Sequence, residues 1–175
     1  MNSVKDIQVL LVDDNRQMRA LVRSLLRAAG VYRVAEAEGS VEAFDLMHRF
    51  QIDLIIADWM MRPIDGIAFT KMVRLAKDSP SPMAPILMLT AHTEVSRVAQ
   101  ARDAGVNGFI KKPISARLLF ERISAALLDT RPFVRTETFF GPDRRRGADP
   151  RYVGPHRRAS DRPDFIDLED ERLRA

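Results

Sequence analysis

The sequence predicts an α/β protein: a doubly wound parallel sheet of five strands in the order 2-1-3-4-5, followed by an irregular C-terminal extension. Five short apolar runs alternate with five segments in which apolar residues recur at helical spacing. The runs are continuously apolar, which is typical of strands covered by helices on both faces. Right-handed crossovers leave few other topologies for such a repeat, so we expect the doubly wound order.

The expected elements can be placed in chain order. Strands are predicted over residues 7–12, 32–37, 54–57, 85–89 and 108–111, with a helix after each one. Asn15, Ser40 and Ser115 stand just before helical stretches and have side chains that cap helix N-termini. Gly30 and Gly105 stand where two helices should end. The third helix is expected to run from Gly66 to about residue 77.

Length and composition indicate one domain with an appendage. The chain has 175 residues, and we expect a domain over 5–130 and, over 131–175, a tail rich in Arg and Pro that ends in an acidic segment. Because there is no cysteine, disulfides, thiolate zinc sites and cysteine nucleophiles are excluded. No apolar run reaches the roughly 18 residues of a membrane helix, and no basic-then-apolar leader opens the chain. We therefore expect a cytoplasmic protein.

Polar residues follow four of the five predicted strands. Asp13 and Asp14 come after the first strand and Asp58 after the third, while Thr90 and Lys112 follow the fourth and fifth. The carboxyl ends of parallel strands meet at one sheet edge, so these side chains should converge there. Clustered carboxylates repel unless a cation intervenes, and Mg²⁺ prefers such oxygen ligands. The set indicates phosphoryl transfer, with one carboxylate as nucleophile and Lys112 and Thr90 contacting phosphoryl oxygens.

Each of these residues also has a simpler explanation. An Asp pair before a helix is commonly a cap, an Asp after a strand is commonly solvated, and Lys112-Pro113 alone indicates a turn. Helix caps and turns would not require all five of these residues to occur at the ends of neighbouring strands. Their joint occurrence therefore favours a phosphoryl-transfer site.

At these positions the residues resemble a known family. Asp13-Asp14, Asp58, Thr90-Ala91 and Lys112-Pro113, in this order, are similar to the CheY-like receiver domain of bacterial two-component signalling, over about residues 5–130. The resemblance implies that Asp58 is the phosphoacceptor. It implies that Asp14, Asp58 and the Met60 carbonyl bind Mg²⁺, with Asp13 acting through water. It also implies that Thr90 and Phe109 are switch residues that remodel the face made by the fourth helix, fifth strand and fifth helix.

Several positions depart from the commoner family pattern. Phe109 lacks the hydroxyl of the tyrosine often found there, and a plain core phenylalanine is an equal alternative to a moving switch. Met60 and His92 occupy positions that, by resemblance, tune access of the hydrolytic water, and a bulky Met60 implies a longer-lived phosphoryl group. Pro63 comes one residue later than usual, which leaves the conformation of its loop open.

The tail is basic and then acidic. Residues 131–162 hold nine Arg and four acidic residues, and five acidic residues follow in 163–175. A near repeat, GPDRRRGAD and GPHRRASD, places an Asp three residues after each Arg cluster. Arg forks bind phosphates and guanine edges, and the Arg-x-x-Asp spacing is similar to a sequence used at cyclic di-GMP sites. The candidate nucleotide-binding residues are Arg144, Arg145, Arg146, Asp149, Arg157, Arg158 and Asp161.

Several functions remain open for this tail. A protein-docking tail and a solvated tail are alternatives to nucleotide binding, while nucleic acid is disfavoured because the acidic end would oppose a polyanion. Phe165 and Ile166, with Leu168 and Leu173, would form a short amphipathic helix or fold back onto the Arg segment.

We predict a non-enzymatic response regulator, at most self-catalysing its own phosphorylation and dephosphorylation, with a histidine kinase or phosphotransfer protein as donor. Its target would be a chemotaxis, motor or phosphorelay component. The competing hypotheses are a cyclic di-GMP effector, for example in motility control, and a DNA-binding regulator.

Overall fold

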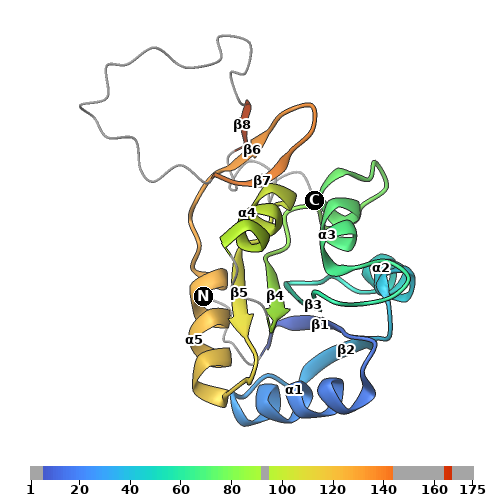
Figure 1. Ribbon diagram of the computed structural model, residues 1–175, viewed down its shortest axis with the longest axis vertical. Coiled ribbons are helices and arrows are strands. Elements are labelled where there is room, and N and C mark those ends of the chain that lie inside the picture. Colours follow the sequence, from blue (N-terminus) through green and yellow to red (C-terminus); the bar gives the residue numbers. More distant parts are fainter. Residues whose placement is uncertain (1–5, 92–94, 144–163, 167–175) are drawn as a thin grey trace, which may run out of the picture.

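The structure is a computed structural model that describes residues 6–91, 95–143 and 164–166. Its main sheet is parallel, in the order β2-β1-β3-β4-β5, as predicted (Figure 1). The five strands are short and lie within a residue or two of their expected positions: β1 Gln8–Val12, β2 Arg33–Ala37, β3 Leu54–Asp58, β4 Ile86–Thr90 and β5 Gly108–Lys111. The predicted fold class is therefore confirmed.

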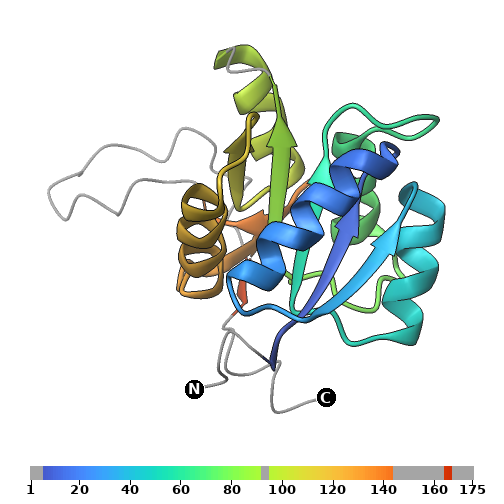
Figure 2. The same ribbon diagram turned by 90° about the horizontal axis from the view of Figure 1, so that it is seen from below.

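Helices cover both faces of this sheet, as Figure 2 shows. They are α1 Arg16–Ala28, α2 Ser40–Arg49, α3 Gly66–Leu75, α4 Val95–Ala104 and α5 Ala116–Leu127. One apolar core includes side chains of α1 and α5, and the other includes side chains of α2, α3 and α4. Successive strand residues alternate between the cores, so Leu10 joins one and Leu11 the other. The continuous apolar runs are explained by this two-sided burial.

Two of the three predicted helix caps are correct. The Asn15 side chain accepts hydrogen bonds from Gln17 N and Met18 N, and that of Ser115 accepts one from Leu118 N. The third prediction is wrong, because α2 is capped by Gly39 without a side-chain bond. Ser40 is instead the first helical residue, and its hydroxyl donates to the Ile64 carbonyl at 3.1 Å.

The C-terminal extension has more structure than the sequence predicted. β6 (Phe133–Arg135) pairs antiparallel with β7 (Phe140–Pro142) and with β8 (Asp164–Ile166), in the order β7-β6-β8. The expectation of an irregular extension is wrong for these segments, and that of a helix is wrong for residues 164–166. Three-residue strands are too short to show a period, which is why the sequence did not reveal them.

The β6–β7 hairpin packs onto the five-stranded domain. Phe133 and Phe140 are buried, and their rings are in contact with centroids 5.4 Å apart. In Figure 1 the hairpin lies beside α4, at the end of the sheet opposite the arrowheads of β4 and β5. In the described part of the chain, no helix combines the length and apolarity that a bilayer span demands.

Candidate functional site

The sheet brings three carboxylates together at its carboxyl edge. β1 and β3 are neighbours, with Val12 opposite Ala57, so Asp13 and Asp14 at the end of β1 lie beside Asp58 at the end of β3. One carboxylate oxygen from each of the three residues lies within 4.8 Å of the others. Asp13 and Asp58 are buried, and Asp14 is exposed. The cluster is therefore closed on the protein side and open toward solvent through Asp14.

Asp58 is held by two donors. Its Oδ2 accepts from the Met60 backbone N–H at 3.0 Å, and its Oδ1 accepts from Lys112 Nζ at 2.7 Å. The Lys112 backbone N–H donates to the Thr90 carbonyl at 2.9 Å, so the ends of β4 and β5 are joined beside this carboxylate. Charge-assisted bonds of this length fix the orientation of the carboxyl group.

Asp13 is the incompletely satisfied member of the cluster. Its Oδ1 accepts from Asn15 N–H at 2.8 Å, whereas its Oδ2 is buried without a hydrogen-bond partner and lies 3.9 Å from Lys112 Nζ. Burial raises the pKa of Asp13; the Asn15 bond opposes that rise, and the Asp58 charge adds to it. A buried carboxylate oxygen without a donor is costly. A divalent cation would satisfy it, so the donor set fits Mg²⁺.

Thr90 and Phe109 lie on neighbouring strands. Thr90 is buried at the end of β4 and pairs in register with Lys111, and Phe109 pairs with Met88. Phe109 is partly buried and packs against the core on the α3–α4 side. His92 lies outside the described residues.

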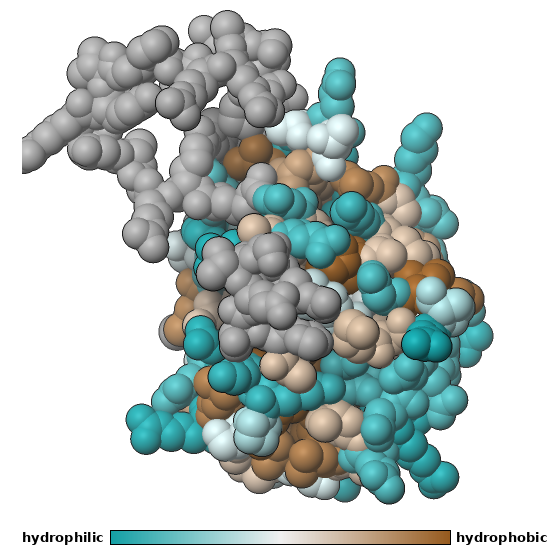
Figure 3. Space-filling model, in the orientation of Figure 1, coloured by the Kyte–Doolittle hydropathy of each residue, from teal (hydrophilic) through white to brown (hydrophobic). Residues whose placement is uncertain are grey.

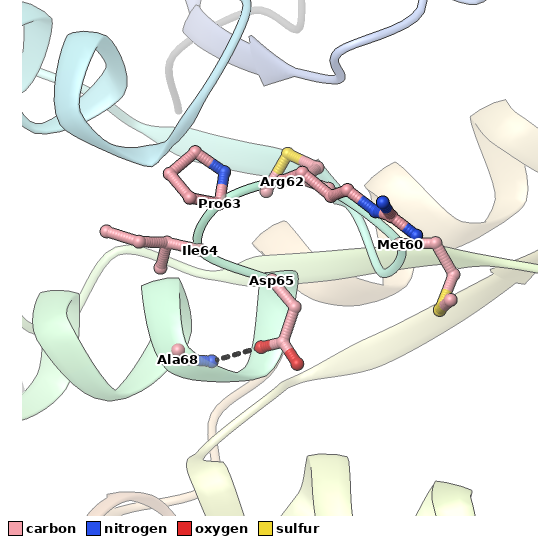
Figure 4. A pocket seen from close by; sticks show the side chains of 7 residues that line it. Met60, Arg62, Pro63, Ile64, Asp65 and Ala68 are labelled. Carbon is pink, nitrogen blue, oxygen red and sulfur yellow. Dashed lines mark hydrogen bonds between the residues drawn. The ribbon is translucent and has the colours of Figure 1, made fainter.

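The loop after Asp58 borders a pocket. The pocket holds about 440 Å³ and is lined by Met60, Met61, Arg62, Pro63, Ile64, Asp65 and Ala68. Figure 4 shows the Asp65 carboxylate turned back to the first turn of α3, where it accepts from Ala68 N–H at 2.8 Å. Met60 is 61% exposed, so its thioether stands at the surface beside the phosphoacceptor candidate.

The sequence reasoning missed two residues that shape this site. Arg19 is buried on the apolar stripe of α1, and it donates to the Asp13 carbonyl at 2.7 Å and to Glu38 at 2.6 Å. The sequence does contain a sign of this burial: Arg19 is a charged residue at helical spacing from Val22 and Leu26, on the inner face of the helix. Gly66 allows close approach, because an added Cβ would lie 2.7 Å from Met88 Sδ and closer still to the Asp58 carbonyl.

The candidate nucleotide-binding residues of the tail lie outside the described residues. All seven fall within 144–163, the segment between β7 and β8.

Comparison with known proteins identifies the class. The family model of the response regulator receiver domain matches residues 9–124. The chain therefore belongs to the response regulator receiver family, as the resemblance implied. It is 35% identical over 117 residues to the chemotaxis protein CheY of Pseudomonas aeruginosa, covering 67% of this chain and 93% of that protein.

Solved structures agree with this class. The chemotaxis protein CheY4 of Vibrio cholerae aligns with a TM-score of 0.64 at 32% identity, covering 69% of this chain and 98% of that one. The receiver domain of a Pseudomonas aeruginosa sensor histidine kinase, solved with magnesium in its active-site cleft, aligns with a TM-score of 0.62 at 24% identity over 70% of this chain and 98% of that one. This last likeness shows the fold alone.

Proposed function

We propose that the chain is a response regulator in which Asp58 accepts a phosphoryl group from a histidine kinase or a phosphotransfer protein. The observation that supports this most strongly is the setting of Asp58. Its carboxylate is fixed between the Met60 amide and the Lys112 ammonium, close to Asp13, whose buried Oδ2 accepts no hydrogen bond. The Asp58 carboxylate is thus oriented as a nucleophile, and the neighbouring Asp13 oxygen is suited to support a bound cation.

In this proposal Asp14, Asp58 and the Met60 carbonyl hold Mg²⁺, and Asp13 supports the ion through a water. The described oxygen cluster and the membership of the receiver family both favour this ligand set. Bound magnesium would neutralise negative charge on the phosphoryl oxygens. The sensor-kinase receiver with the same fold was solved with that ion in its cleft.

The chain's own residues would carry the transfer. An Asp58 oxygen forms a bond to phosphorus as the nitrogen–phosphorus bond of a phosphohistidine breaks, and the electron pair returns to the imidazole nitrogen. Lys112, already bonded to Asp58, neutralises a phosphoryl oxygen, and the Thr90 hydroxyl donates to another. The product is an acyl phosphate, which water later hydrolyses. The chain acts only on its own phosphoryl group and is not an enzyme toward a separate substrate.

The output in this proposal is a protein contact. Thr90 moves toward the phosphoryl group, Phe109 turns inward, and the surface of α4, β5 and α5 changes for a downstream target. Two of the aligned relatives are chemotaxis proteins, which favours a chemotaxis, motor or phosphorelay component as target. The exposed thioether of Met60 would hinder the hydrolytic water and lengthen the life of the acyl phosphate.

The test is uptake of a radiolabelled phosphoryl group from a small phosphodonor, with and without Mg²⁺. We expect labelling of the wild-type chain that depends on magnesium, and none in Asp58→Asn. Asp65→Asn is a matched control, because Asp65 lies on the same loop but caps α3. Equal labelling of wild type and Asp58→Asn would contradict the proposal.

A second candidate is binding of cyclic di-GMP by the Arg-rich segment, which would modulate the same regulator. Two observations favour it: the near repeat of Arg clusters, and the pairing of β7 and β8, the strands before and after residues 144–163 in the sequence, with the same strand β6. Cyclic di-GMP would be titrated against the full chain and against a chain with Arg144, Arg145 and Arg146 changed to Ser. Point changes are preferable to truncation, because truncation would remove the buried Phe133 and Phe140. Equal affinity, or no binding, would remove this candidate.

A further inference from the structure

Arg74 is a buried charge far from the carboxylate cluster. It lies on α3, is 1% exposed, and stacks its guanidinium Cζ 5.2 Å from the centroid of the Phe133 ring. Burial lowers the pKa of Arg74 to about 9, so the side chain is still protonated at neutral pH. Five hydrogen bonds donated to neutral oxygens of the protein compensate the charge.

The oxygens that accept these hydrogen bonds belong to residues that precede two strands. The Pro82 and Ala84 carbonyls, at 2.5 and 2.8 Å, lie just before β4. The Gly105 carbonyl, at 3.1 Å, and Asn107 Oδ1, at 2.9 Å, lie just before β5. The Arg74 guanidinium therefore links the starts of β4 and β5, and we call Arg74 with these acceptors the brace.

Asn107 completes this brace. Its Oδ1 also accepts from the Ile86 backbone N–H at 3.0 Å, and its own backbone N–H donates to the Ile86 carbonyl at 2.9 Å. Asn107 ties the first residue of β4 to the turn before β5, and Arg74 holds that turn against α3. These bonds link the two strands at their starts, where a change would affect how they pair.

The opposite ends of the same strands carry the phosphoryl-transfer residues. β4 ends at Thr90, and β5 has four residues that lead directly to Lys112, which is bonded to Asp58 at 2.7 Å. The chain from Thr90 to Lys112 thus leaves the carboxylate cluster, turns at Gly105–Asn107, and returns to it. Because β5 is short and paired throughout, a shift at its start would carry through to Lys112.

The C-terminal hairpin packs against Arg74 and against the turn that precedes β5. The Phe133 ring covers the guanidinium, and the Phe140 carbonyl lies 2.7 Å from where a Gly105 Cβ would be. A Cβ on Gly141 would lie 2.8 Å from the Gly105 Cα. The hairpin and the α4–β5 turn are therefore in backbone contact, with no room for a larger side chain at either glycine. In Figure 3, apolar side chains lie among hydrophilic ones at the upper end of the molecule, where Figure 1 shows the hairpin.

We propose that Arg74 is a positioning residue for phosphoryl transfer: it holds β4 and β5 in the register that brings Thr90 and Lys112 to Asp58, and the β6–β7 hairpin keeps it in place. The inference rests on the proposed function of Asp58. It makes the extension beyond residue 130 a working part of the phosphoacceptor apparatus. Asp13 and Asp14 follow β1 and Asp58 ends β3, so none of the three carboxylates stands on β4 or β5. A displaced Lys112 would take a positive charge away from Asp58, which would not weaken cation binding.

The cation ligands and the two transfer residues stand on different strands, so Mg²⁺ binding and phosphorylation rate can be measured separately. A general loss of stability would impair both. The variants are Arg74→Lys, which keeps a nitrogen donor but loses the planar fork of the guanidinium, and Phe133→Leu, which keeps an apolar cover but loses the ring. Arg117→Lys is the control, since Arg117 is exposed on α5. Phosphorylation rate is measured at saturating small phosphodonor, and Mg²⁺ affinity is measured by fluorescence of Trp59, the single tryptophan, which is next to Asp58.

We expect the maximal phosphorylation rate to fall roughly tenfold in Arg74→Lys and less in Phe133→Leu, because small displacements of transfer groups are costly. Mg²⁺ affinity should not fall in either variant. If Arg74→Lys does not fold, Phe133→Leu and Gly141→Ala carry the test. Wild-type rates in the folded variants, or a parallel loss of Mg²⁺ affinity, would overturn the inference alone. Failure of the wild-type chain to take up phosphate would overturn the proposed function as well.

Discussion

The two ends of the parallel sheet both bury charge, and they compensate it in opposite ways. At the carboxyl end, Asp13 and Asp58 are buried beside Asp14, with Lys112 as the neighbouring cation and one Asp13 oxygen left without a donor. At the amino end, Arg74 is buried and donates five hydrogen bonds to oxygens of the protein itself. An end that is saturated internally is structural, whereas an end that leaves a buried charge unsatisfied is suited to bind a ligand.

The largest expected effect is at the saturated end. Arg74→Met should lower the free energy of unfolding by about 4 kcal/mol, because several buried oxygens lose their donors at once. Chemical denaturation measures this, with Arg117→Met as the control at a side chain that is 90% exposed. A loss for Arg74→Met as small as that of the control would show that the amino end is not saturated by this residue.

The hairpin should contribute nearly as much. Phe140→Ala should destabilise the chain by about 3 kcal/mol, because Phe140 is fully buried between the extension and the main domain. Phe120→Ala removes a ring of the same size that is 45% exposed on α5, and its effect should be much smaller. Equal effects in denaturation experiments would mean that the hairpin does not pack as described.

At the unsaturated end, removing charge should help folding. Without divalent cations at neutral pH, Asp13→Asn should raise the free energy of unfolding by about 1 kcal/mol, since the ionised wild-type side chain is buried. The pKa of Asp13 is raised in the folded state above its ordinary value of 3.8. This advantage should therefore disappear below pH 3.8, where the wild-type side chain is protonated in both the folded and the unfolded chain.

Magnesium should reverse that order. It should stabilise the wild-type chain in thermal melts more than Asp13→Asn, because the variant lacks the charge that supports the ion through water. Stabilisation of both chains to the same degree would show that Asp13 does not help to hold the ion.

The smallest effect is expected at the Asp129–Arg131 pair near the hairpin. Burial alone would raise the pKa of Asp129, but hydrogen bonds from Arg131 and Asn107 outweigh it and lower the pKa. The pair's contribution is therefore present above pH 3.8 and lost as pH falls through the folded-state pKa. Asp129→Asn should cost only about 0.5 kcal/mol at neutral pH, because Arg131 is partly exposed. A larger loss that persists at acid pH would point to packing instead of charge.

The sequence predicted the carboxyl end of the sheet far better than the amino end. Continuous apolar strands and right-handed crossovers determine which strand ends meet, so Asp13, Asp58 and Lys112 could be brought together without coordinates. Arg74 follows Val73 on an ordinary helix, and its burial depends on a hairpin whose strands have three residues each. Such contacts are set by tertiary packing and leave no periodic signal in the chain.

The same limit applies to local details. Ser40 is a good capping residue, yet its hydroxyl bonds to Ile64 across the structure and Gly39 takes the cap position. Phe109 is partly buried against the core and lies on the strand that ends at Lys111, next to Lys112, while its role as a switch stays a prediction. Sequence spacing defines where such residues stand, while their partners come from other elements.

Asp58 is the residue that should carry the phosphoryl group at the unsaturated end of the sheet. The most direct measurement is to treat the wild-type chain with a phosphodonor and Mg²⁺, reduce any acyl phosphate with borohydride, and map the modified residue by peptide mass spectrometry. Reduction converts a phosphorylated aspartate to homoserine. We predict homoserine at position 58 that appears only with magnesium; homoserine at another aspartate, or none under conditions that label the chain, would contradict the account.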